Sequence, residues 1–147
     1  MIGRLILTQG GLAQELLAAA QTISGQNGET MAGYEALSLD WHEPVEQAKD
    51  KVRAALGRLD QGEGVLILTD MYGGTPCNVA LSFLQIGKVE VLTGVNLPMV
   101  VRLTCPGLEG LDVTELGKWL QAKAQRSVCL ASDVAHQKEC GTKVGPS

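Results

Sequence analysis

Four short polar or glycine-rich stretches each follow an apolar run, and they hold the residues best suited to chemistry. They are Thr8-Gln9-Gly10-Gly11, Asp40 to Glu43, Asp70-Met71-Tyr72-Gly73-Gly74-Thr75 and Thr93-Gly94-Val95-Asn96. If the apolar runs are parallel strands, all four stretches leave the same edge of one sheet, and open α/β sheets bind their ligands beyond that edge. The pattern therefore predicts one shared site.

The third stretch is typical of an anion site. Gly73 and Gly74 let the backbone approach a ligand closely, and Thr75 stands where it could cap the following helix, so that N–H groups and a hydroxyl would face outward together. Asp70, at the end of the preceding run, would hold a cationic or N–H partner, or would serve only to fix the turn. The other candidate anion-binding residues are Thr8, Gly10 and Asn96, the last of which could instead bond its own turn.

The first stretch raises the question of reaction or binding, because its central residue is Gln9. A glutamine does not titrate near neutral pH and is a poor nucleophile. Its amide group can donate to Asp70 and to an anion, and its oxygen can accept. Gln9 therefore suits a site that binds better than one that reacts.

Alternating strand-like and helix-like spacings predict an α/β domain. We expect strands at 2–8, 34–40, 65–69, 88–94 and 127–131, and helices at 12–23, 45–59, 75–84, from 97 onward and at 111–125. Three consecutive strand–helix units imply parallel strands joined by right-handed crossovers. We expect a three-layer αβα fold with a mostly parallel central sheet, and we take its strand order as 2-1-3-4.

Composition excludes several classes of function. A chain of 147 residues, 45% of them hydrophobic, suits one domain, which we place at 1–131, with a loosely held tail at 132–147. A formal net charge of −4 without a run of Lys or Arg argues against a nucleic-acid partner. The apolar runs are too short for a membrane span and do not resemble a signal peptide, so we expect a soluble cytoplasmic protein.

The cysteines indicate neither a metal site nor a redox pair. Cys77, Cys105, Cys129 and Cys140 show no C-x-x-C spacing and have no histidine at ligand distance. Free cysteine is among the most buried residue types, and we expect four buried thiols. No cofactor is predicted.

Two longer motifs indicate a family. The stretches "GVLILTDMYGGTPCN" at 64–78 and "GVNLPM" at 94–99 are accompanied by "LAQELL" in the first helix and "LSLD" before the second. Together they resemble the mannose-class (mannose/fructose/sorbose) IIA components, or EIIA, of the bacterial phosphoenolpyruvate-dependent sugar phosphotransferase system (PTS). The resemblance runs from residue 2 to residue 131.

This resemblance implies a phosphocarrier role. In the family, a histidine in the first strand–helix turn takes a phosphoryl group from the phosphocarrier HPr and passes it to the EIIB component. By position, Asp70 would orient the imidazole, Thr75 would lie beside the phosphate, and Gly73 and Gly74 would supply backbone donors. The acceptor position falls on Gln9, whose amide nitrogen cannot replace imidazole because its lone pair is delocalised. The resemblance also implies a homodimer in which the strand at 127–131 runs antiparallel and is exchanged between subunits.

Three explanations of Gln9 stay open. We favour a naturally degenerate member that keeps the fold and the binding surface for regulation or for contact with a protein partner. An engineered His→Gln change in an active phosphocarrier is the second explanation. The third is relocation of the acceptor to His42, in a loop at the same edge, or to His136 in the tail.

Two other classes of protein share parts of the pattern. A receiver-like signalling domain would use Asp70 as its acceptor and Thr93 as its hydroxyl residue, but it needs an acidic pair where Thr8 and Gln9 stand. A flavodoxin-like cofactor binder would need several donors in the first loop, where Thr8 supplies the one hydroxyl. Both therefore fit the pattern less well than the PTS family does.

Overall fold

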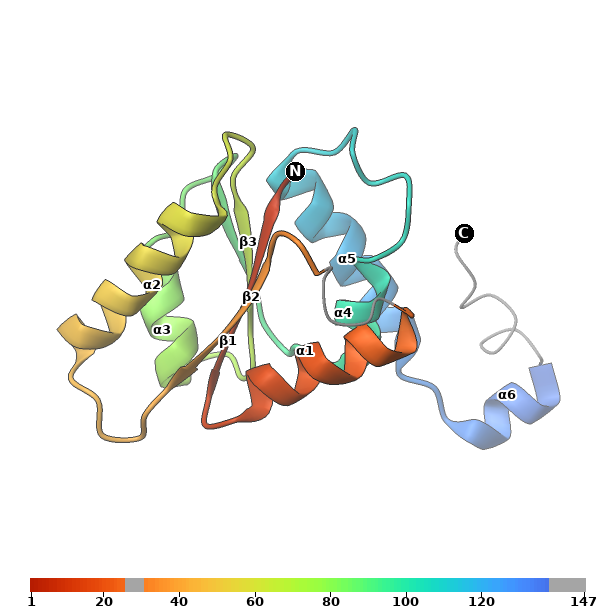
Figure 1. The fold of residues 1–147 in the computed structure, drawn as a ribbon. Helices are drawn as coiled ribbons and strands as arrows, with labels where there is room; N and C mark the ends of the chain where they lie inside the picture. The colour runs from red at the N-terminus through yellow and green to blue at the C-terminus, as the bar shows by residue number, and fades with distance from the viewer. Residues whose placement is uncertain (26–30, 138–147) are drawn as a thin grey trace.

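Four parallel strands form the centre of the molecule (Figure 1). The computed structural model describes residues 1–25 and 31–137. The strands are β1 (Gly3–Gln9), β2 (Tyr34–Leu39), β3 (Val65–Thr69) and β4 (Val89–Leu92), and their order in the sheet is β2-β1-β3-β4. The predicted fold class, parallel pairing and strand order are confirmed.

Helices cover both faces of this sheet, as Figure 1 shows. The helices α2 and α3 pack on one face, and α1, α4 and α5 on the other. Their bounds are α1 Leu12–Ile23, α2 Val45–Leu59, α3 Thr75–Leu81, α4 Leu97–Arg102, α5 Val113–Ser127 and α6 Ala131–Gln137. Among residues 1–25 and 31–137, no helix is both long and apolar enough to cross a membrane.

Side chains of the central strands alternate between two cores, which explains why these runs are apolar throughout. Along β1, Leu5 and Leu7 face α2 and α3, whereas Ile6 between them faces α1 and α5. All three are fully buried. A strand covered by helices on both faces has no solvent-facing positions, so it reads as a continuous apolar run rather than an alternating one.

The carboxyl-terminal part of the chain differs from the expectation. The expected strand at 127–131 does not form in the single chain, because α5 continues to Ser127 and α6 begins at Ala131. Figure 1 shows α6 set apart from the sheet. The expected tail at 132–147 lies partly in this helix and partly, from 138 onward, outside the described residues.

Element ends elsewhere shift by a few residues. The third helix ends at Leu81 rather than at residue 84, and the fourth strand covers Val89–Leu92 rather than 88–94. These shifts leave the four polar loops at the carboxyl ends of the strands, where the sequence predicts them.

Candidate functional site

The four loops at the carboxyl edge are tied to one another by hydrogen bonds. The amide nitrogen of Gly10 donates to the carbonyl oxygen of Leu39 over 3.3 Å and joins the first loop to the second strand. The backbone N–H of Gln9 donates to Asp70 Oδ2 over 3.1 Å and joins the first loop to the third. Gly94 donates to the carbonyl oxygen of Asp70 over 2.9 Å and joins the fourth loop to the third. The stretches that the sequence predicts to converge therefore do lie together.

The side chain of Gln9 points to the second strand rather than to Asp70. Its amide nitrogen Nε2 donates to the carbonyl oxygens of Leu39 and Asp40 over 3.4 and 3.1 Å. The amide group could in principle donate to Asp70, but in the structure the backbone N–H of Gln9 makes that contact. The amide therefore links the first and second loops.

Asp70 is bonded to backbone N–H groups through both of its carboxylate oxygens. Oδ2 accepts from Gln9 and Oδ1 accepts from Met71 over 2.7 Å. The carboxylate therefore fixes its own turn and also holds the turn that contains residue 9.

The Gly73–Thr75 segment is partly bonded within its own loop, because the Gly74 N–H donates to the carbonyl oxygen of Met71 over 3.1 Å and the Gly73 carbonyl accepts from Asn78 Nδ2 over 3.3 Å. Gly73 has a φ of +86°, a conformation that favours glycine, and a Cβ there would meet no atom within 4 Å. Thr75 is the first residue of α3 rather than its cap, since Gly74 occupies the cap position, and Thr75 is exposed. The hydroxyl of Thr75 therefore faces solvent at the helix start.

Two of the candidate anion-binding residues instead hold the backbone. Thr8 is fully buried, and its hydroxyl oxygen accepts from the N–H of Ala13 over 2.9 Å in the first turn of α1. The side-chain oxygen of Asn96 accepts from the N–H of Met99 over 3.0 Å and caps α4. The positive φ of Gly10, +62°, allows the turn between β1 and α1.

The second loop carries an exposed histidine and is fixed by an ion pair. His42 is exposed. Next to it, the Glu43 side chain is 3% exposed and pairs with Lys51 over 2.6 Å. The hydrogen bond from Lys51 to Glu43 raises the pKa of Lys51, because it favours the charged ammonium. The Glu43–Lys51 pair thus fixes the loop in which His42 lies, although the sequence alone gave no sign of it.

Large apolar side chains stand exposed on the loops of this edge. Trp41 and Tyr72 are each 76% exposed, and Met71 is 69% exposed. Exposed aromatic and Met side chains beside a polar site are typical of a surface that contacts another protein.

No group of three metal-ligating side chains occurs within residues 1–25 and 31–137.

The cysteines differ from the expectation of four buried thiols. Cys77 is a buried thiol and Cys105 a half-buried one, but Cys129 is exposed and disulfide-bonded, and Cys140 lies outside the described residues.

The parallel sheet and its joined loops define an α/β binding domain with its site at the carboxyl edge. The family model EIIA-man, described as the PTS system fructose IIA component, matches residues 3–113. The chain therefore belongs to the EIIA-man family of the sugar phosphotransferase system. Membership in this family favours the PTS interpretation over the receiver-like and flavodoxin-like ones.

Relatives by sequence agree with this assignment. The chain is 36% identical over 102 residues to the PTS system mannose-specific EIIAB component of Escherichia coli (strain K12), a match that covers 68% of this chain and 30% of that protein. It is 32% identical over 92 residues to the PTS system fructose-specific EIIA component of Bacillus subtilis (strain 168), covering 62% of each. The chain thus spans less than a third of the length of the first relative.

Solved structures agree as well. The mannose/sorbose specific IIA subunit of the phosphotransferase system from Enterococcus faecalis is 29% identical, with a TM-score of 0.74 and coverage of 88% of this chain and 93% of that one. The PTS IIA protein associated with the fucose utilization operon of Streptococcus pneumoniae is 28% identical, with a TM-score of 0.72 and coverage of 89% and 93%.

Proposed function

We propose that this chain is a phosphorylation-silent EIIA module that acts through regulation or partner binding in the cytoplasm. The observation that carries the proposal is the chemistry of Gln9 at the turn where the family places its acceptor histidine. Its amide nitrogen has no free lone pair for phosphoryl transfer and is engaged with the carbonyls of Leu39 and Asp40. The residue thus serves as a link between loops.

The rest of the family's constellation is kept. Asp70 holds the turn at residue 9, and Thr75 presents an exposed hydroxyl in the same loop as Asp70, whereas the Gly74 N–H is bonded to Met71. These groups support a role in contacting a phosphoryl group carried by a partner, without accepting it covalently.

The partners that we propose are an HPr-like phosphocarrier, an EIIB component or a regulatory protein. The exposed Trp41, Met71 and Tyr72 support a protein contact at the loops of the carboxyl edge. A partner that docks on these side chains would cover the polar groups of the site at the same time.

We also propose a homodimer. Val128 and Leu130 are 80% and 68% exposed in the segment between α5 and α6, and β4 is the outer strand of the sheet. If 127–131 paired with β4 of a second copy, both the apolar side chains and the strand edge would be covered. Sedimentation analysis should show a dimer that dissociates in the variant Val128→Lys/Leu130→Lys.

A phosphorylation assay tests the main proposal. The wild type and Gln9→His are each incubated with phosphoenolpyruvate, enzyme I and HPr, and intact mass is measured under conditions that preserve phosphohistidine. We expect no adduct on the wild type and an adduct on Gln9→His, because Asp70 already bonds the turn that would carry the new imidazole. Gln9→Asn, which keeps an amide at the same position, is the matched control and should stay unmodified.

A stoichiometric adduct on the wild type would refute the silent module. If His42→Ala then abolished that adduct, the acceptor would lie in the second loop. If the wild type stays silent and Gln9→His gains the full activity of a phosphocarrier, with a transferable phosphoryl group, the same result also fits a single engineered change. The sequence encoded by the natural gene then separates the two.

A further inference from the structure

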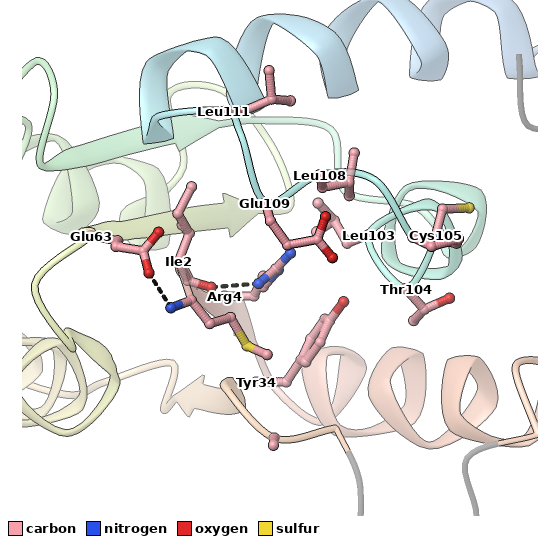
Figure 2. A pocket seen from close by; sticks show the side chains of 13 residues that line it. Ile2, Arg4, Tyr34, Glu63, Leu103, Thr104, Cys105, Leu108, Glu109 and Leu111 are labelled. Atoms are coloured by element: carbon pink, nitrogen blue, oxygen red, sulfur yellow. Dashed lines mark hydrogen bonds and ion pairs between the residues drawn. The ribbon is translucent and has the colours of Figure 1, made fainter.

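A cavity of about 430 Å³ opens at the amino-terminal edge of the sheet, opposite the four loops (Figure 2). The first residues of β1 and β2 form its floor, and the segment between α4 and α5 forms its wall. The volume lies within the range of cavities that bind small molecules. The proposed EIIA function uses the carboxyl edge and does not involve this cavity.

A buried cation faces the cavity. Arg4 is 7% exposed, and its Nη1 donates to the carbonyl oxygen of Ile2 over 2.5 Å. Its Nε has no hydrogen-bond partner in the described part of the chain, and no carboxylate there lies within ion-pair distance of the guanidinium. A buried cation without a counter-charge is costly, and a bound anion removes that cost.

A second unpartnered donor faces the same space. The hydroxyl of Tyr34 is buried and, within residues 1–25 and 31–137, has no hydrogen-bond partner. The Arg4 Cζ atom lies 5.4 Å from the centroid of the Tyr34 ring, and Figure 2 shows both side chains directed into the cavity. The guanidinium and the phenol thus offer hydrogen atoms to one acceptor group.

The walls restrict the ligand. The apolar side chains of Ile2, Leu103, Leu108 and Leu111 line the cavity beside the two donors. At the rim, the Glu63 carboxylate pairs with the amino-terminal ammonium of Met1, whereas the exposed carboxylate of Glu109 would repel a multiply charged anion. The chemistry that fits is one negative charge attached to a compact hydrocarbon body.

We propose that this cavity binds a small monocarboxylate with an apolar body, whose carboxylate accepts from Arg4 Nε and from the Tyr34 hydroxyl. The hydrocarbon part lies against Leu103, Leu108 and Leu111. Such a carboxylate belongs either to a simple branched acid or to an apolar amino acid, whose ammonium group would then meet a rim carboxylate.

Titration calorimetry on the full chain tests the proposal with four probes. 4-Methylpentanoate carries the charge and the branched body, 4-methylpentanamide keeps the shape without the charge, leucine adds the ammonium group, and inorganic phosphate keeps only the negative charge. We expect the carboxylate to bind at least about tenfold more tightly than the amide, since a charge-assisted hydrogen bond is lost. Tighter binding of leucine than of the simple acid would identify the amino acid as the source.

Variants then assign the binding to the two donors. Tyr34→Phe keeps the ring and removes the hydroxyl, and we expect it to weaken carboxylate binding by about fivefold to tenfold. Arg4→Lys keeps the charge but not the planar donor, and it should weaken binding further. Arg53→Lys, at an exposed position on α2 outside the cavity, is the matched control and should bind as the wild type does.

Several results would overturn the proposal. They are equal affinity for the carboxylate and the amide, competition by inorganic phosphate at similar concentration, and no saturable binding of 4-methylpentanoate or leucine. Unchanged affinity in a folded Tyr34→Phe and a folded Arg4→Lys would do the same. Circular dichroism of each variant establishes whether it is folded, and Tyr34→Phe serves if Arg4→Lys does not fold.

Discussion

The turn at the carboxyl edge of the sheet and the cavity at its amino edge treat their polar groups in opposite ways. In the turn, both oxygens of Asp70 and the amide of Gln9 are bonded to loop backbone. In the cavity, Arg4 Nε and the Tyr34 hydroxyl are buried without a partner in the described ranges. The contrast is between these two places rather than between whole edges, because Thr69 Oγ1 and Glu43 Oε2 near the carboxyl edge are also buried without a hydrogen-bond partner in the described residues. The turn is therefore held by bonds within the protein, whereas the cavity gains stability when its donors are satisfied.

The largest effect that we predict concerns how the amino edge is held. If backbone contacts hold this edge, a methyl group at Gly64 should disrupt it. The φ of Gly64 is +90°, and a Cβ there would collide with the carbonyl oxygen of Lys88. We expect Gly64→Ala to lower the free energy of unfolding by about 3 kcal/mol, measured by denaturant unfolding.

Gly62→Ala is the control for this substitution. Gly62 also has a positive φ, of +105°, but a Cβ there would meet nothing within 4 Å. Backbone strain alone should cost about 1 kcal/mol. Equal losses in the two variants would show that the contact with Lys88 does not hold this edge.

The second prediction concerns the carboxyl edge. Asp70→Ala removes the acceptor for the N–H groups of Gln9 and Met71. We expect the free energy of unfolding to fall by about 1 to 2 kcal/mol, because the partly buried N–H of Gln9 and the exposed N–H of Met71 lose their acceptor. Thr75→Ala, which changes an exposed side chain in the same loop, should stay within about 0.5 kcal/mol of the wild type. If both variants unfold alike, Asp70 does not hold the first loop.

The convergence of the loops could be predicted because it depends on periodicity alone. The run at 65–68 is apolar at every position, which indicates a strand covered on both faces, and strand–helix alternation then places every strand end at one edge. The polar stretches must meet there. Predicting this convergence requires no knowledge of long-range side-chain contacts.

Side-chain directions could not be predicted, because they depend on partners far along the chain. The amide of Gln9 bonds carbonyls of Leu39 and Asp40, which reach it only through the pairing of β1 with β2. The hydroxyl of Thr8, which is fully buried, accepts a hydrogen bond from the N–H of Ala13 in the first turn of α1. The type of a single polar residue at a strand end does not reveal whether its side chain bonds the backbone or a ligand.

The amino-edge cavity left one signal in the sequence. Arg4 interrupts the otherwise aliphatic run "IGRLILT", and a charged residue inside a strand buried on both faces needs a partner. The run "SVCLA" and the family resemblance predict a strand at 127–131, but a strand forms only with a neighbour to pair with, and within the described part of the single chain 127–131 has none.

The third prediction uses the burial of Tyr34. Burial raises the pKa of Tyr34 from 10.0 to about 12, although the nearby charge of Arg4 opposes the shift. The folded state therefore holds the phenol proton more tightly than the unfolded chain does. This contribution to stability is complete below pH 10 and is lost as the pH rises toward 12. It adds a slope of at most about 1.4 kcal/mol per pH unit.

The measurement is the free energy of unfolding against pH for the wild type, Tyr34→Phe and Tyr72→Phe. The alkaline decline should be shallower in Tyr34→Phe, which has no phenol to deprotonate at this position. Tyr72→Phe retains Tyr34 and should keep the wild-type slope. Parallel curves for all three proteins would show that the Tyr34 proton is not held by the fold.

The smallest effect has the opposite sign and sharpens the contrast between the cavity and the turn. At neutral pH, Tyr34→Phe removes a buried hydroxyl that has no partner in the described ranges, so the variant no longer bears the cost of desolvating it. We expect the free energy of unfolding to rise by about 0.5 to 1 kcal/mol, whereas Tyr72→Phe, at a side chain 76% exposed, should leave it unchanged. Saturating 4-methylpentanoate should reverse the order, because the ligand stabilises the wild type more than the variant. A loss of stability in ligand-free Tyr34→Phe would mean that the hydroxyl is already satisfied within the protein, and the cavity would then not differ from the turn at Gln9 and Asp70 in this respect.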